Sequence, residues 1–421
     1  MKLIQPTYLS GKLFVQGSKS HFIRVGLCSL FNHSEELIIS NISKCDDDLA
    51  VIELLKSIGM NLIWEDNSLI ISGSPKNILG EINAQESGLL ARMLFSVYSH
   101  FSHQYKITGT GTLLNRKMLF EEISLKSIGL STKSQNDYLP MNISGTIKSE
   151  KGGEYFLDGN SGSQFLSGAL LAFSQISKKN HQSILHVENL KSKPYIDLTI
   201  KTLASFGAEI KNYDYKKFII NSNQRLFLDR IEIESDWSSA SFFIVAAIIS
   251  GDLELLGLDF NSTQADRQIL KVLKKAEIHY KIEKNILHIW KQNYKGFWFN
   301  AQDCPDLIPI LTVLALRADG SSKISGANRL KNKESKRADV LIKEFAKLGV
   351  EIELSGDDFL ISPQRINSGK IDSHSDHRIA MTFSIAGLLA EGGIEIENPK
   401  CVSKSYPNFY KDFDSLKTQT G

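Results

Sequence analysis

One pattern recurs along this chain at nearly even spacing: an amphipathic helix, a small residue, and two short strands separated by a polar turn. Apolar residues at positions i, i+3 and i+4 mark each helix, and the small residue after it is typical of a left-handed C-cap. The helices are predicted within 51–60, 121–130, 198–210, 269–280 and 338–352, and the small residues are Gly59, Gly129, Gly207, Ala276 and Gly349. Two occurrences of this pattern would not indicate a repeat, because helix–glycine–strand is a common connection. Five at a spacing of roughly 70 residues indicate a structural repeat.

This spacing predicts about six repeats in 421 residues, and a chain of this length normally forms more than one domain. The sixth helix, predicted over 408–416, comes too close to the end of the sequence for a strand pair to follow it. We therefore expect the N-terminal strand, residues 12–16, to complete the sixth repeat. Three repeats per domain then predict a discontinuous domain 1 of residues 1–17 and 235–421, which holds both termini, and a continuous domain 2 of residues 18–234.

Composition limits the class of partner. The net charge is only +2, whereas surfaces for nucleic acid or anionic membranes need clustered lysine and arginine. The four cysteines form no Cys-x-x-Cys pair, so neither a disulfide framework nor a structural zinc site is indicated. The first residues lack the apolar segment of a signal peptide, and the longest apolar runs fall short of the ~20 residues of a membrane span. We expect a cytoplasmic protein that binds neither nucleic acid nor membranes.

Two further helices are predicted over 163–174 and 238–249, each beginning at a serine. Serine is a favoured N-cap residue. The N–H groups and partial positive charge at a helix N-terminus attract anions without a charged side chain. Both helix starts are therefore candidate anion contacts.

Basic residues also stand in short polar segments, containing glycine or serine, from one end of the chain to the other. A nearly neutral chain has no general electrostatic reason to place cations there, so convergence in the fold would create a pocket for ligands carrying several negative charges. Small molecules bearing phosphate and carboxylate groups fit that description. The basic residues are Lys19, Arg24, Arg116, Arg337, Arg378 and Lys404.

Candidate proton carriers accompany these cations: Asp306, Glu334, His377 and Lys404. Proton transfer between anionic substrates needs acids and bases whose pKa values are separated by neighbouring cations and burial. Taken singly, each of these residues is more typical of a solvated surface group. Their position in cation-rich segments favours a shared catalytic site.

Together these segments resemble the EPSP synthases, a family of enolpyruvyl transferases, over nearly the whole chain. The residues that carry the resemblance are, in order, Gly17-Ser18-Lys19-Ser20 with Arg24, Glu86-Ser87-Gly88, Asn115-Arg116, Ser163-Gln164-Phe165-Leu166, Ser192-Lys193-Pro194-Tyr195-Ile196-Asp197, Ser238-Ser239-Ala240, Pro305-Asp306, Lys333-Glu334 with Arg337, Asp376-His377-Arg378, and Pro399-Lys400-Cys401 with Lys404.

The resemblance implies an α/β fold of two domains, each built from three inverted βαβαββ units, with the active site in the cleft between them. It implies transfer of the enolpyruvyl group of phosphoenolpyruvate to the 5-hydroxyl of shikimate 3-phosphate with release of phosphate, by a monomer that needs no metal or cofactor. The implied shikimate 3-phosphate contacts are Lys19, Ser20, Arg24, Ser163, Gln164, Ser192, Tyr195, Asp306 and Lys333. The implied phosphoenolpyruvate contacts are Lys19, Gly88, Arg116, Gln164, Arg337, Arg378 and Lys404.

The chemistry of this transfer suggests roles for the proton carriers. The hydroxyl must lose a proton and the methylene must gain one, through a tetrahedral intermediate that expels phosphate. We expect Asp306 to act on the hydroxyl, and Glu334 with Lys404 or Lys19 to deliver the proton to the methylene, with His377 nearby.

Five features depart from the family pattern and bear on affinity. Gly162 stands where a phosphate-binding serine is common, and Lys336 where an aspartate precedes Arg337. The others are Gln16 in place of proline, His21-Phe22-Ile23 in place of polar residues, and Leu89 in place of threonine. Two alternatives stay open. One is a transferase acting on UDP-N-acetylglucosamine, which typically carries a catalytic cysteine in a mobile loop; no cysteine lies near Arg116 here. The other is a phosphometabolite-binding protein without catalysis, which would have no need for the acid–base residues.

Overall fold

The computed structural model describes residues 1–118, 122–147, 153–176 and 181–418. The chain divides into two compact units. Unit 1 consists of Met1–Gln16 and Glu234–Gly421, and unit 2 consists of Gly17–Ile233.

Unit 2 has six helices and twelve strands among its described residues. The helices are α1 (Lys19–Ser29), α2 (Asp46–Ser57), α3 (Gly88–Val97), α4 (Glu122–Ser127), α5 (Gln164–Ser174) and α6 (Pro194–Ser205), with 3-10 turns η1 (Tyr98–His100) and η2 (Gly111–Asn115). The strands are β3 (Glu36–Ser40), β4 (Asn61–Glu65), β5 (Ser68–Ser72), β6 (Glu81–Asn83), β7 (Gln104–Thr108), β8 (Leu130–Gln135), β9 (Tyr138–Gly145), β10 (Glu154–Asp158), β11 (Gln182–Glu188), β12 (Ile210–Tyr213), β13 (Lys217–Asn221) and β14 (Arg230–Glu232).

Unit 1 has the corresponding elements. Its helices are α7 (Trp237–Ser250), α8 (Ile269–Lys275), α9 (Ile308–Leu316), α10 (Arg337–Lys347), α11 (His377–Ala386) and α12 (Phe409–Ser415), with 3-10 turns η3 (Ala265–Gln268), η4 (Pro305–Leu307), η5 (Ala327–Leu330) and η6 (Pro399–Lys404). Its strands are β1 (Lys2–Ile4), β2 (Leu9–Phe14), β15 (Gly251–Leu256), β16 (Lys281–Glu283), β17 (Ile286–Trp290), β18 (Trp298–Asn300), β19 (Ser322–Ser325), β20 (Glu353–Ser355), β21 (Asp358–Ile361), β22 (Gly369–Asp372) and β23 (Ile394–Glu397).

Five of the six sheets in the described ranges share one topology. Their strand orders are β14-β3-β5-β4, β6-β7-β9-β8, β10-β11-β13-β12, β2-β15-β17-β16 and β18-β19-β21-β20. In each, the first two strands pair in parallel and the other pairs are antiparallel. The sixth sheet has three strands, β1-β23-β22, and keeps the parallel pair. This is the repeat that the spacing of helices and strand pairs predicts.

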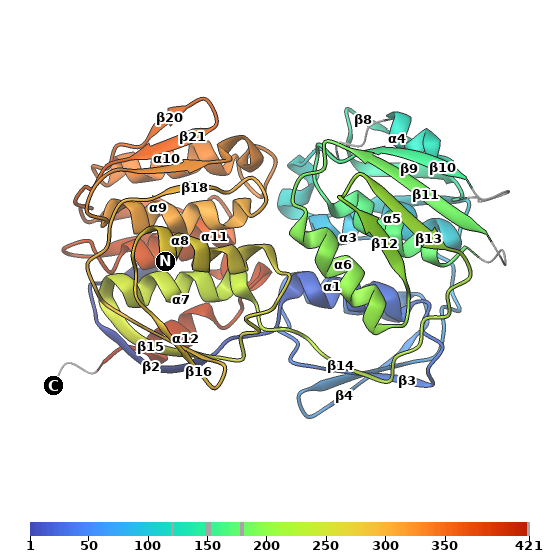
Figure 1. Cartoon of the computed structure of the whole chain (residues 1–421), viewed down its shortest axis with the longest axis horizontal. Coiled ribbons are helices and arrows are strands. Elements are labelled where there is room, and N and C mark those ends of the chain that lie inside the picture. The colour runs from blue at the N-terminus through green and yellow to red at the C-terminus, as the bar shows by residue number, and fades with distance from the viewer. Residues whose placement is uncertain (119–121, 148–152, 177–180, 419–421) are drawn as a thin grey trace. The chain divides into compact units, whose positions relative to one another are not determined.

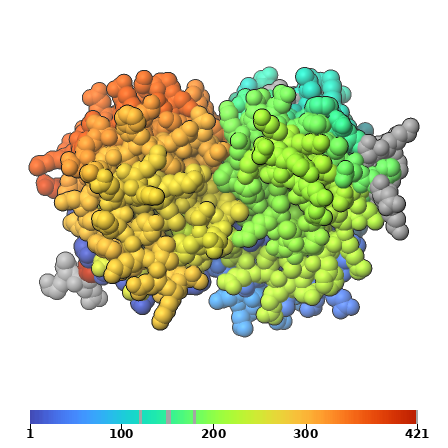
Figure 2. All heavy atoms as spheres, viewed as in Figure 1, coloured from blue at the N-terminus to red at the C-terminus, as the bar shows by residue number. Residues whose placement is uncertain are grey.

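Within each unit, one helix from each repeat lies on the inside and the sheets lie around it (Figure 1). The inner helices are α1, α3 and α5 in unit 2, and α7, α9 and α11 in unit 1; all are almost wholly buried. Helices that are apolar on every side must be enclosed, and α7 and α9 have such sequences. The near face of unit 1 is formed largely by the yellow segment that contains α8 and β16–β18 (Figure 2).

The prediction of a left-handed residue after the helix is confirmed at four of the five repeats. Gly59, Gly129, Gly207 and Gly349 have φ between +75° and +89°. At the remaining repeat the prediction of Ala276 is wrong by one position. Ala276 ends helix α8 with φ −85°, and the left-handed residue is Glu277, with φ +57°. Glu277 therefore occupies the place that glycine holds elsewhere.

The predicted role of the N-terminal strand is also wrong. Strand β2 pairs in parallel with β15 and so begins the repeat that contains α8, whereas the short β1 pairs with β23 in the sixth repeat. Strand β1 has only three residues, which is too few to show a periodic pattern of apolar residues, and the sequence therefore did not predict it. The backbone N–H of Thr418 bonds to the carbonyl of Tyr8, which joins the two ends of the chain within unit 1.

Candidate active site

In unit 1, three cations surround the side chain of Asp306, which lies in η4 just before α9. Lys333 Nζ is 3.1 Å from Asp306 Oδ1, Arg337 Nη1 is 3.0 Å from the same oxygen, and Arg378 Nη2 is 3.5 Å from Oδ2. Arg378 Nη1 also donates to the backbone carbonyl of Asp306. The fold thus brings together four of the residues that the sequence predicts to bind substrate.

These charges determine the protonation of the cluster. Burial alone raises the pKa of Asp306, but the positive charges of Arg378, Lys333 and Arg337 outweigh it and hold the pKa well below its usual value. Burial lowers the pKa of Lys333, and the charge of Asp306 opposes that shift. Asp306 is therefore a carboxylate at neutral pH.

Arg337, the first residue of α10, is fully buried among carboxylates. Its Nε donates to Asp376 Oδ2 at 2.9 Å and its Nη2 to Asp376 Oδ1 at 3.1 Å, while Nη2 also reaches Glu334 Oε2 at 2.6 Å. Burial would lower the pKa of Arg337, but Asp376, Glu334 and Asp306 together raise it. The neighbouring Lys336 is exposed and leaves these contacts intact.

Asp376 also fixes the start of α11, because its Oδ1 caps the backbone N–H of Arg378 at 3.0 Å. His377 is buried beside it, with Nδ1 3.9 Å from Asp376 Oδ1. Lys404, in η6, is 4% exposed, and η6 packs against α11. Lys404 and Arg378 are thus buried cations on neighbouring elements.

Ser238 is not the cap of α7 that the sequence predicts. Asp236 caps the helix and accepts the backbone N–H of Ser238 at 3.0 Å. This leaves the Ser238 hydroxyl to accept from Arg378 Nη2 at 2.6 Å and to donate to Asp266 Oδ2 at 2.6 Å. Sequence reasoning missed Asp266, since Gln264-Ala265-Asp266 reads as an ordinary polar turn.

In unit 2, Arg24 links its own helix, α1, to α5, through Ser167 Oγ at 3.3 Å, and to α6. It lies on α1, is 1% exposed, and donates to Thr199 Oγ1 at 2.8 Å, to the Ser20 carbonyl at 2.6 Å and to the Tyr195 carbonyl at 3.2 Å. Its guanidinium carbon lies 5.8 Å from the centre of the Tyr195 ring. Burial lowers the pKa of Arg24 to about 10, so it stays charged at neutral pH.

Lys19, at the first position of α1, pairs with a carboxylate that the sequence prediction left out. Its Nζ is 2.7 Å from Oδ2 of Asp47, which lies in the first turn of α2 and is 4% exposed. The three consecutive aspartates Asp46-Asp47-Asp48 were the only sequence signal for this contact. Acidic residues are common at a helix N-terminus, so the run does not by itself indicate a second role for Asp47.

Arg92 is a third residue that the predicted site leaves out. It is 8% exposed, and its Nη1 donates to Gln164 Oε1 at 3.1 Å and to the Gly88 carbonyl at 3.1 Å. Its Nη2 donates to the Lys117 carbonyl at 2.9 Å, next to the buried Arg116. Arg92 therefore fixes the places of Gln164, Gly88 and the Arg116 segment relative to one another.

Gly88 begins α3 where two guanidinium groups leave no room for a side chain. A Cβ there would lie 2.8 Å from Arg116 Nη1 and 2.9 Å from Arg92 Nη1. The resemblance implies that Arg116 contacts phosphoenolpyruvate. On that expectation, Gly88→Ala should displace Arg116 and raise the KM for phosphoenolpyruvate about tenfold or more, with a smaller change in the KM for shikimate 3-phosphate. Steady-state kinetics with each substrate varied in turn measure this split. Gly80→Ala, where an added Cβ meets nothing within 4 Å, is the matched control.

The serines predicted to bind substrate lie at the ends of elements. Ser163 holds the N-cap position of α5, although its hydroxyl makes no capping bond. Ser192 adopts a left-handed conformation with φ +60° just before α6. Gly162 has φ +123°, so the serine common at this position in the family would be strained here.

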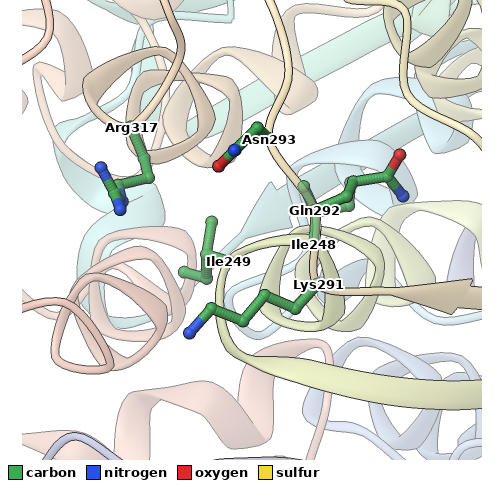
Figure 3. A pocket seen from close by; sticks show the side chains of 6 residues that line it. All are labelled: Ile248, Ile249, Lys291, Gln292, Asn293 and Arg317. Atoms are coloured by element: carbon green, nitrogen blue, oxygen red, sulfur yellow. The ribbon is translucent and has the colours of Figure 1, made fainter.

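None of these residues lines a cavity of about 260 Å³ in unit 1 (Figure 3). It is lined by Ile248 and Ile249 at the end of α7, by Lys291, Gln292 and Asn293 after β17, and by Arg317 after α9. Carbonyl groups at helix C-termini favour cations. The positive charges of Lys291 and Arg317 therefore favour the C-terminal ends of α7 and α9.

No group of three or more His, Cys, Asp or Glu side chains in the described ranges could hold a metal ion. None of the helices described is both long and apolar enough to cross a membrane.

Comparison with known proteins agrees with this geometry. The profile of the family described as EPSP synthase (3-phosphoshikimate 1-carboxyvinyltransferase) matches residues 3–413. The chain is 34% identical over 423 residues to the 3-phosphoshikimate 1-carboxyvinyltransferase of Clostridium perfringens, covering 98% of this chain and 97% of that one. It is 35% identical over 421 residues to the corresponding protein of Clostridium acetobutylicum, with coverages of 98% and 96%.

Solved structures give the same result. EPSP synthase from Acinetobacter baumannii superposes with a TM-score of 0.78 at 25% identity, over 99% of this chain and 97% of that one. The enolpyruvyl transferase NikO from Streptomyces tendae shares the fold, with a TM-score of 0.76 at 15% identity over 98% and 96% of the two chains. The α/β fold of enolpyruvyl transferases is therefore confirmed. The chain belongs to the EPSP synthase (3-phosphoshikimate 1-carboxyvinyltransferase) family, and its activity is that of this family, in the shikimate pathway of aromatic amino acid biosynthesis.

Proposed function

We propose that phosphoenolpyruvate binds to cations from both units: Arg337, Arg378 and Lys404 of unit 1, and Lys19 and Arg116 of unit 2, with Gly88 and Gln164. Guanidinium forks match carboxylate and phosphate groups geometrically. All five cations are buried or half-buried, and a buried cation is stabilised by an anion. The single observation that carries the proposal is the convergence of three predicted substrate contacts, Lys333, Arg337 and Arg378, on the side chain of a fourth, Asp306.

Shikimate 3-phosphate is proposed to bind Lys19, Ser20, Arg24, Ser163, Gln164, Ser192 and Tyr195 of unit 2, with Asp306 and Lys333 of unit 1. Hydroxyl groups and the N-terminus of α5 suit a phosphate. Asp306 suits a hydroxyl, since a carboxylate only accepts hydrogen bonds.

The proposed reaction needs one base and one acid. Asp306 takes the proton of the 5-hydroxyl as its oxygen bonds to the enol carbon, and Glu334, with Lys404 or Lys19, donates a proton to the methylene. As the bond to phosphate breaks, the new methyl group of the tetrahedral intermediate returns a proton to the group that had donated one to the methylene, which restores the double bond. The low pKa of Asp306 makes it a weak base in the absence of ligands. Bound anions offset the charges of Arg378, Lys333 and Arg337, which raises the pKa of Asp306 toward the range a base needs.

The decisive experiment measures phosphate release with phosphoenolpyruvate and either shikimate 3-phosphate or UDP-N-acetylglucosamine as acceptor. We expect turnover with the first acceptor only. Turnover with the UDP-sugar alone would favour the other transferase, and tight binding of both expected substrates without phosphate release would favour a non-catalytic protein. We further propose that the enzyme is a cytoplasmic monomer, which size-exclusion chromatography and cell fractionation test.

A further inference from the structure

A buried carboxylate that the proposed mechanism does not use lies behind Arg378. Asp266, in η3, is 2% exposed. Its Oδ2 accepts a hydrogen bond from the Ser238 hydroxyl, while its Oδ1 has no hydrogen-bond partner among the described residues. Such an oxygen is costly to bury with a negative charge.

The charged groups around Asp266 come from three other elements. Arg378 of α11 approaches through Ser238, with its Nη2 2.6 Å from the Ser238 Oγ. Asp306 of η4 and Asp236 at the start of α7 add negative charge, and the buried thiol of Cys304 lies close enough to interact electrostatically. Arg378 is the cation that faces Asp266, and it is shared with Asp306, 3.5 Å from its Nη2.

An anion bound to Arg378 changes this balance. Its negative charge offsets that of the guanidinium, so that Asp266 becomes a buried carboxylate without an effective counter-charge. A carboxylate in that position binds a proton rather than remain charged. The proton comes from solvent, and Asp266 passes from the carboxylate to the neutral acid.

We propose that Asp266 takes up a proton when phosphoenolpyruvate binds Arg378, and that this coupling makes the affinity for phosphoenolpyruvate depend on pH. The inference rests on the proposed function, in which Arg378 contacts that substrate. Asp266 is a positioning residue that acts through Ser238 and Arg378 and does not touch the substrate.

The ionisation of Asp266 sets the pH range of the effect. Burial raises its pKa to about 7, with Arg378 opposing the shift and Asp306 and Asp236 adding to it. A ligand that raises this pKa further binds best when Asp266 is already protonated, below about pH 7. The affinity therefore falls as the pH rises through that value, and levels off above the pKa of the complex.

Asp266→Asn tests the inference, because asparagine has nearly the same shape and imitates the neutral acid. The measurement is kcat/KM for phosphoenolpyruvate at saturating shikimate 3-phosphate, from pH 6 to 9, which reports the ionisation of the protein before phosphoenolpyruvate binds. We expect the ratio of variant to wild type to be near one at pH 6 and to rise to about five- to tenfold at pH 8. Titration of phosphoenolpyruvate itself cancels in this ratio.

Asp412→Asn is the matched control. Asp412, in α12 of the same unit, is another aspartate whose pKa burial raises, and its Oδ2 accepts a hydrogen bond from the Tyr406 hydroxyl. Its variant should leave the fall in kcat/KM between pH 7 and 8 in place. A ratio for Asp266→Asn that does not change with pH would overturn the inference, whereas failure of the wild-type protein to release phosphate would overturn the proposed function.

A second variant covers the case in which Asp266→Asn does not fold. Ser238→Ala removes the hydrogen bond that favours the charged form of Asp266, so its pKa rises and the fall in kcat/KM moves to higher pH. An unchanged pH profile in Ser238→Ala would contradict the coupling.

Discussion

Asp306→Asn is expected to lower turnover about a hundredfold or more, because the amide keeps the shape of the side chain but cannot accept the hydroxyl proton. The KM for phosphoenolpyruvate should stay equal or fall. Without the carboxylate, less negative charge lies beside Lys333, Arg337 and Arg378. These three cations therefore attract a bound anion at least as strongly as before. Steady-state kinetics separate the two effects.

This division between kcat and KM distinguishes a base from a structural residue. If Asp306 only held the cations in place, the variant would scatter them and the KM would rise with little change in kcat. Asp319→Asn, at an exposed position after α9, is the control and should change neither constant. Wild-type turnover in Asp306→Asn would refute its role as the base.

The pH dependence of this site follows from the same charges. The pKa of Asp306 lies well below its usual value in the folded protein, so the carboxylate contributes stability above the pKa of an unfolded aspartate. That contribution is lost as the pH falls through the folded value. Within the neutral range Asp306 remains ionised without ligands, so an ionisation near pH 6 in the ligand-free protein would have to come from another group.

The repeat could be predicted from sequence because each helix must end before a strand pair begins, and a left-handed residue marks that point. The same rule misplaced one residue: Glu277 is left-handed where Ala276 was predicted, since a small side chain is a sign of this conformation and not its cause. Strand β1 was missed because three residues carry no period.

The cations of the proposed site could be singled out because they stand in unusual local contexts, but their hydrogen-bond partners could not. Asp266, Asp47 and Arg92 lie far in sequence from the residues they serve, which are Ser238, Lys19 and Gln164. Only the packing of the helices that carry them brings these pairs together. Sequence patterns report local periodicity and cannot show which long-range neighbours share a hydrogen bond.

Arg337→Met is expected to lower the free energy of unfolding of unit 1 by about 3–5 kcal/mol, because it leaves buried carboxylates without their cation. Arg337 is fully buried and bonds to Asp376, Glu334 and Asp306. Urea unfolding followed by fluorescence measures the loss. Lys343→Ala is the control on the same helix, since Lys343 is exposed, and it should change the free energy by no more than about 0.5 kcal/mol.

The pH dependence of the stability loss in Arg337→Met shows whether charge or packing causes it. If uncompensated negative charge is responsible, acid relieves it by protonating the carboxylates that lost their partner, and the deficit relative to wild type should be clearly smaller at pH 5 than at pH 7. A deficit produced only by altered packing would be the same at both pH values. The arginine that the sequence marks as a substrate contact would then also be the residue that makes three acids, buried or half-buried, compatible with a folded unit 1, which joins stability and binding in one side chain.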